Sequence, residues 1–157
     1  MKGLYETEKT TPGYLLAGSI YGPSYLSFDF ALSRYGLIPE VVYVFTSDTF
    51  EKKKTKKYST PFGVYIYRDI PSEVYPLGIK LIREGSYAYQ IATPEKALCD
   101  KLYSVSPVRN KKELQSLLFE DLRIDEMGFE GLDRKELLEL CELYHCTNLK
   151  MLRKLLR

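Results

Sequence analysis

Three charged residues near position 50 have the spacing of a metal-dependent nuclease site. Glu51 and Lys53 form an E-x-K pattern, and Asp48 supplies an acid upstream. Such sites need carboxylates on rigid strands, where they hold a hard cation such as Mg²⁺ that activates water. We expect these acids to lie in a loop, among lysines that would compete with a metal for them. A nuclease-related enzyme is therefore an alternative interpretation, and we predict no catalytic residue.

Five lysines overlap this pattern, and they could bind phosphates. They are Lys52, Lys53, Lys54, Lys56 and Lys57. Ammonium groups on a loop release counterions when they contact nucleic acid, which makes binding salt-dependent. However, no arginine lies among them, and a net charge of +2 does not by itself indicate a nucleic-acid-binding protein. The plainer interpretation is a solvated hairpin tip that protects neighbouring strand edges. Nucleic-acid binding through these lysines stays a second alternative.

The thiols and the single histidine have no complete metal-site pattern. Cys141, His145 and Cys146 are close in sequence, but a structural zinc site needs four ligands and Cys99 is distant. Cys141 fits the apolar stripe of a helix, so we expect a buried thiol there. Three cysteines without framework spacing indicate reduced thiols in a cytoplasm. Phosphate-binding loops and dinucleotide fingerprints are also absent, and we predict neither metal nor cofactor.

Length and composition predict one globular domain. The chain has 157 residues, of which 45% are hydrophobic and 28% charged. No apolar run approaches 18 residues and no export leader is present, so we predict a cytoplasmic protein without membrane contact. We divide the chain into a linker-like start at residues 1–12, a core at residues 13–106 and a helical subdomain at residues 107–157.

The hydrophobic pattern predicts an α+β fold. Four segments have strand composition, and the last two flank a glycine turn as a hairpin. They are residues 41–46, 62–68, 79–82 and 87–92. Their order in the sheet does not follow from the sequence. We therefore predict about four strands in a mixed or antiparallel sheet, packed by helices and followed by a C-terminal helical bundle.

Two helices with clear boundaries should pack on this sheet. Ser27 is a plausible N-cap of the first, Gly36 supplies a left-handed cap at its end, and Pro39 prevents its continuation. In the second, Thr93 is the N-cap and Pro94 occupies the first helical position, where no amide donor is needed.

The start of the second helix carries the densest charged cluster of any predicted helix. Glu95 lies on the apolar stripe, where the helix dipole and free amides make its partial burial tolerable. Lys96 and Asp100 are four residues apart, and we expect them to pair on the outer face. A structural role explains this cluster better than a catalytic carboxylate.

These two helical segments and their flanks resemble the C-terminal domain of AbiEi-type antitoxins. That family contains the repressor partners of bacterial type IV abortive-infection toxin–antitoxin pairs. Its domain has Pro-Ser-Tyr, a Ser-opened helix ending in Gly-Leu-Ile-Pro, a strand, a basic hairpin, an aromatic strand and Ile-Ala-(Ser/Thr)-Pro-Glu-Lys-Ala-Leu before an Asp. The resemblance covers residues 3–103. The matching positions are Pro23, Ser24, Tyr25, Ser27, Gly36, Pro39, Thr93, Pro94, Glu95, Lys96 and Asp100.

The resemblance implies a non-enzymatic antitoxin or regulatory module of phage defence. Such a module counteracts a nucleotidyltransferase-like toxin by opposing its effect, without a tight complex. Family members usually carry an N-terminal winged helix that binds the operon's promoter and supports transcriptional autoregulation. Residues 3–6 resemble the last strand of that wing, so the expectation for this chain is the antitoxin half of the family's function. Of the family's properties, DNA binding is the one that we expect least of this chain, because it depends on the winged helix.

Overall fold

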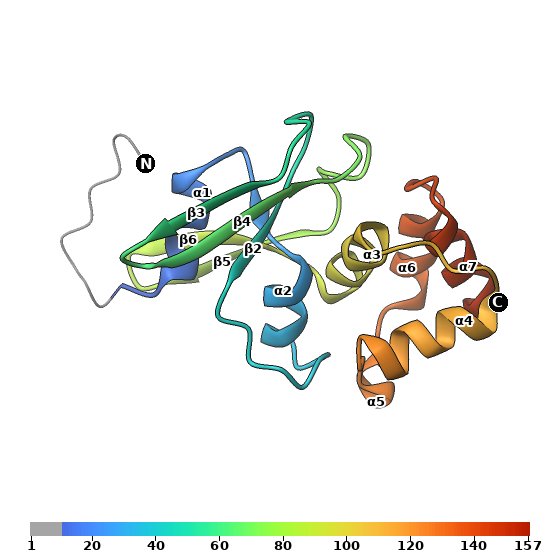
Figure 1. The fold of residues 1–157 in the computed structure, drawn as a ribbon. Coiled ribbons are helices and arrows are strands. Elements are labelled where there is room, and N and C mark those ends of the chain that lie inside the picture. The colour runs from blue at the N-terminus through green and yellow to red at the C-terminus, as the bar shows by residue number, and fades with distance from the viewer. Residues whose placement is uncertain (1–10) are drawn as a thin grey trace.

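The structure is a computed structural model that describes residues 11–157. Six strands form one mixed sheet in the order β3-β4-β2-β1-β6-β5 (Figure 1). The strands are β1 (Tyr25–Leu26), β2 (Phe45–Thr49), β3 (Lys56–Thr60), β4 (Gly63–Asp69), β5 (Ile79–Glu84) and β6 (Tyr87–Ala92). The helices are η1 (Gly13–Leu16), α1 (Ala17–Ile20), α2 (Phe28–Arg34), α3 (Pro94–Ser104), α4 (Lys111–Ser116), the π-helix η2 (Leu117–Asp121), α5 (Glu126–Glu130), α6 (Arg134–Cys141) and α7 (Thr147–Leu156).

The α+β class is confirmed, but the count of four strands is wrong. The two strands that the prediction missed are β1, which has only two residues, and β3, which is an edge strand rich in lysine. Strand β4 separates β2 from β3, so the lysine-bearing segment between them is not a hairpin tip. The β5–β6 hairpin is confirmed. Residues 3–6, which resemble the last strand of the family's wing, lie outside the described residues.

The predicted strand at residues 41–46 is also wrong, because the strand begins at Phe45 and ends at Thr49. Val41 and Tyr43 are 70% and 81% exposed, so strand propensity alone does not place them in the sheet. The buried positions of β2 are instead polar. Its register is set by parallel pairing with β4 and antiparallel pairing with β1.

The two faces of the central strands pack on different helices. Tyr65 and Tyr67 of β4 are fully buried, and their hydroxyls donate to the carbonyls of Gly13 and Ala17 at 2.7 and 2.6 Å. Since side chains alternate along a strand, Asp48 of β2 points away from this face. It faces α3 instead.

Helix α3 lies between the sheet and helices α4–α7 (Figure 1), and it contacts α2, β6, α6 and α7. Its predicted cap is confirmed, because the Thr93 hydroxyl accepts from the Lys96 amide at 3.1 Å. For α2, Ser27 is the N-cap residue, but its hydroxyl does not bond to a helix amide. Gly36 has the expected left-handed φ of 74° at the end of α2.

A buried asparagine joins the end of α3 to the helical subdomain. Asn148 of α7 is 2% exposed, and its amide nitrogen donates to the carbonyls of Leu102, Val105 and Ser106. Its side-chain oxygen accepts from the Val108 amide at 2.9 Å. One side chain thus satisfies backbone groups at the end of α3 and in the segment that follows it, of which the Leu102 carbonyl is buried.

Candidate functional site

The residues of the two family-like motifs meet in one buried polar cluster. We call it the Lys96 cluster, and it consists of Tyr25, Ser27, Asp48, Lys96, Asp100 and Tyr144. Lys96, Asp48 and Asp100 are 0% exposed, although charged side chains are almost never fully buried unless they are paired. The cluster connects β1, β2, α3 and the segment after α6.

Local structure explains how these groups meet. Tyr25 of β1 and Asp48 of β2 are opposite each other in the antiparallel register, so both point to the same face of the sheet. Lys96 and Asp100 lie one turn apart on the α3 surface that covers this face. Gly78 closes over the lysine stem: its φ is +67°, and a Cβ there would be 2.7 Å from the Cβ of Lys96.

Asp100 is the acceptor at the centre of the hydrogen-bond network. One carboxylate oxygen accepts from the Lys96 ammonium at 2.8 Å and from the Tyr144 hydroxyl at 2.5 Å. The other oxygen accepts from the Ser27 hydroxyl at 2.7 Å. The Lys96 ammonium also donates to the Tyr25 hydroxyl at 2.9 Å, and Tyr25 donates in turn to the Tyr75 carbonyl. These bonds satisfy the buried ion pair.

Burial and the neighbouring charges favour the neutral form of Asp48. Its carboxyl lies 3.5 Å from the Lys96 nitrogen, and neither oxygen has a hydrogen-bond partner among the described residues. Burial, and then the charge of Asp100, raise the pKa of Asp48 well above its ordinary value, while the Lys96 ammonium opposes this shift. In the protonated form that this shift favours, the cluster would contain one cation and one anion. Burial also raises the pKa of Tyr25 and Tyr144, which stay neutral donors.

The expected position of Lys96 and Asp100 on the outer face of their helix is wrong, although their pairing is confirmed. The helix is covered on both sides, by the sheet and by α6 and α7, so its polar stripe is buried as well as its apolar one. The participation of Tyr25 and Tyr144 was not predicted. No pattern within residues 95–100 distinguishes this buried pair from the ordinary surface pair that its i, i+4 spacing suggests.

The predicted nuclease pattern is divided between the interior and the surface. Asp48 is not in a loop but in β2, where it is fully buried. Glu51 and Lys53 are exposed in the loop after β2, both with left-handed backbone. Glu51 accepts from Ser72, and the Lys53 amide donates to Asp69. The three side chains therefore form no common cleft.

The lysines of residues 52–57 do not converge on one point either. Lys52 is half-buried, with its ammonium 3.3 Å from the Gly22 carbonyl and over the ring of Tyr21. Lys53 and Lys54 are exposed in the loop, and Lys56 and Lys57 lie within β3. Alternate residues of a strand point to opposite faces, so these two ammonium groups diverge.

The thiols lie mainly in the core. Cys99 and Cys141 are buried neighbours, and burial followed by the adjacent Cys141 thiol raises the pKa of Cys99. The expected burial of Cys141 is confirmed. Within residues 11–157, no three His, Cys, Asp or Glu side chains are grouped as a metal would need. His145 is exposed, and its ring nitrogen is 3.8 Å from Glu73.

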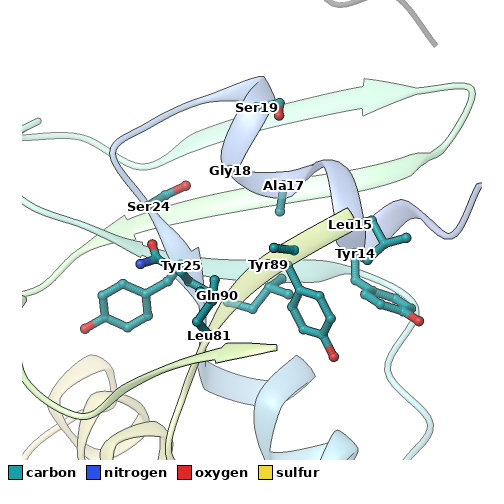
Figure 2. A pocket seen from close by; sticks show the side chains of 12 residues that line it. Tyr14, Leu15, Ala17, Gly18, Ser19, Ser24, Tyr25, Leu81, Tyr89 and Gln90 are labelled. Atoms are coloured by element: carbon teal, nitrogen blue, oxygen red, sulfur yellow. The ribbon is translucent and has the colours of Figure 1, made fainter. Parts of the chain in front are cut away.

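A pocket of about 190 Å³ lies between α1 and the β5–β6 hairpin. Figure 2 shows Tyr14 and Tyr89 side by side at one end of it and Tyr25 at the other. Tyr25 is the one member of the Lys96 cluster in its lining, and only 2% of that residue is exposed. The pocket therefore gives a small molecule no route to the charged groups of the cluster.

Comparison with protein-family models, with curated proteins and with solved structures finds no match. None of the helices in residues 11–157 has the length and apolar composition that a bilayer crossing requires.

Proposed function

We propose that this chain is a non-enzymatic antitoxin or regulatory module of the AbiEi type. It counteracts a nucleotidyltransferase-like toxin in a type IV abortive-infection system of the bacterial cytoplasm. It does so by opposing the toxin's effect, and a stable complex with the toxin is not required. A contribution to transcriptional autoregulation would depend on DNA binding, for which a winged helix is the family's usual device.

The observation that carries this proposal is the complete burial of the Lys96 cluster. The two motifs of the resemblance are about seventy residues apart, and they touch through the bonds of Ser27 and Tyr25 to the charged pair on α3. The charged groups of the motifs are therefore out of reach of a substrate and join two segments of the fold. The motif residues of the cluster therefore stabilise the fold. This is what we expect of a module that acts through its surface and not through a catalytic site.

A growth assay tests the antitoxin role. The chain is co-expressed with the nucleotidyltransferase-like toxin that the proposal assigns to it, each under its own inducible promoter. The expected result is that inducing the chain restores growth, while the purified proteins elute separately on size exclusion. The matched control is Lys96→Met, which disrupts the buried cluster and should lose the rescue. Rescue by neither form, at equal soluble protein levels, would contradict the proposal.

A second assay separates this function from the nuclease-related alternative. The purified chain is incubated with single- and double-stranded DNA and RNA in the presence of Mg²⁺. We expect no cutting above background, since Asp48 is buried and Glu51 and Lys53 lie apart from it on the surface. Mg²⁺-dependent cleavage that disappears in Glu51→Ala would establish the enzyme instead. A steep salt dependence of DNA affinity, flattened by Ser at Lys52, Lys53, Lys56 and Lys57, would support the nucleic-acid-binding alternative.

A further inference from the structure

The last helix of the chain has a basic face that lines a cleft. In α7 and its C-cap residue, four cationic side chains recur at the i, i+3, i+4 and i+7 positions of one helix face. They are Lys150, Arg153, Lys154 and Arg157. The opposite face carries Leu149, Leu152 and Leu156, which are buried in the helical subdomain. The helix is thus fixed by its apolar face and presents its cations outward.

These cations surround a concave space of about 400 Å³. The remaining lining comes from Cys141, Glu142 and His145, at the end of α6 and in the turn before α7. Four cations therefore face a single acid in one cleft, while the net charge of the whole chain is only +2. Among the described residues, Lys150, Lys154 and Arg157 have no carboxylate within 4 Å, so their charges are available.

Arg153, which lines the cleft, has one donor without an acceptor. Arg153 donates through one terminal nitrogen to Glu142 at 3.0 Å. Its Nε is buried and has no acceptor within the described part of the chain. A buried guanidinium N–H without an acceptor is uncommon in proteins, so the pairing with Glu142 leaves part of the donor capacity of Arg153 unused.

The negative end of the α7 dipole does not explain this arrangement. Cations in the last turn of a helix interact favourably with its free carbonyls, and Arg153 and Lys154 are placed to do so. Lys150 lies in the first half of the helix, where that effect is small. The dipole also leaves the Nε of Arg153 without a partner.

We propose that this cleft binds the phosphates of a nucleoside triphosphate. The four cations span roughly 10 Å along the helix. This matches a ligand whose several negative charges lie on adjacent phosphates. Arg153 would donate forked hydrogen bonds to phosphate oxygens, as a guanidinium favours, while the lysines act as point charges. A short cleft lined by one helix and the end of another fits one discrete ligand better than an extended strand of nucleic acid. This inference goes beyond the proposed function and does not depend on it.

Calorimetric titration of the purified chain with ATP, GTP and tripolyphosphate tests the site. We expect saturable binding of all three, with tripolyphosphate displacing ATP because the phosphates carry the recognition. The variant Lys150→Gln/Lys154→Gln/Arg157→Gln should weaken ATP binding at least about tenfold. Arg153→Lys keeps the charge but removes the forked donor set, and it should also weaken binding.

The matched control is Lys53→Gln/Lys54→Gln/Lys57→Gln, which removes the same charge from exposed positions outside the cleft. It should bind ATP within about twofold of the wild type. An equal loss in the control would overturn the proposal, because binding would then follow net charge alone. The proposal is also overturned if no triphosphate binds, or if an oligonucleotide without terminal phosphates binds through the cleft and ATP does not. No toxin is present, so the result is separate from the growth assay.

Discussion

The ammonium of Lys96 and the carboxylate of Asp100 lie one turn apart on α3, 2.8 Å from each other, and both side chains are fully buried. Burying two charges is costly, and good geometry with additional hydrogen bonds is needed to offset that cost. Here Ser27, Tyr25 and Tyr144 supply those bonds. The pair therefore holds four elements in one arrangement, and its loss should be severe.

Lys96→Met should lower the free energy of unfolding by about 3–5 kcal/mol, because Asp100 would remain buried without its cation. Urea denaturation measures this change. Lys101→Met is the matched control on the same helix, since Lys101 forms a partly exposed ion pair with Asp29 at 2.9 Å. That pair should contribute no more than about 1 kcal/mol. Similar losses in both variants would show that the buried pair has no special role.

Relative to the wild type, Asp48→Asn should be more stable at high pH than at low pH. The pKa of Asp48 is raised in the folded state, so the native protein binds one more proton than the unfolded chain above the ordinary pKa of 3.8. Stability from this group is present at acid pH and falls as the pH rises. Asparagine is neutral throughout and removes that decline. Denaturation curves from about pH 4 to about pH 8 measure it, and parallel profiles for the two proteins would contradict a neutral Asp48.

Glu136→Gln should flatten the pH dependence of stability near neutrality. Burial, and then the adjacent carboxyl of Glu95, raise the pKa of Glu136 to about 7 from its ordinary 4.5. The folded state therefore holds a proton that the unfolded chain releases, and stability decreases between about pH 4.5 and about pH 7. Thermal melts across this window measure the slope. Glu139→Gln, at an exposed position of the same helix, should keep the wild-type slope.

Asn148→Ala should cost about 2–3 kcal/mol, because it removes the side-chain partners of the Val108 amide and of the buried Leu102 carbonyl. Equilibrium unfolding in urea measures the loss. Asn110→Ala serves as the comparison, since Asn110 only caps α4 through the Glu113 amide. A cap of this kind contributes about 1 kcal/mol. The prediction fails if the two substitutions are equally mild.

Features encoded by neighbouring residues could be predicted from the sequence. Thr93 and Pro94 define the start of α3, Gly36 the end of α2, and Gly85 the turn of the β5–β6 hairpin. Tyr65 and Tyr67 alternate with Val64 and Ile66 along the sequence, and they are the fully buried pair of this strand. Each of these depends on backbone preferences or alternation within a few residues.

Features that depend on distant partners could not be predicted. The polar residues of β2 are accommodated in the sheet by distant partners. The Thr49 hydroxyl donates to the Asp69 carboxylate, and the Lys96 ammonium lies against Asp48. Strand β1 is two residues long and exists only between β2 and β6. Lys96 and Asp100 have the spacing of an ordinary surface pair, and only the packing of α6 and α7 over α3 makes them interior.

Because α3 is shared by the sheet and the C-terminal helices, the chain has no natural place for recombination between its halves. A crossover near Ser106 would replace α6 and α7 with those of a relative. The residues at positions 144 and 148 of the new segment would still have to bond to Asp100 and to the Leu102 carbonyl, as Tyr144 and Asn148 do. Exchange of the helical end between relatives should therefore succeed only when these contact partners travel together.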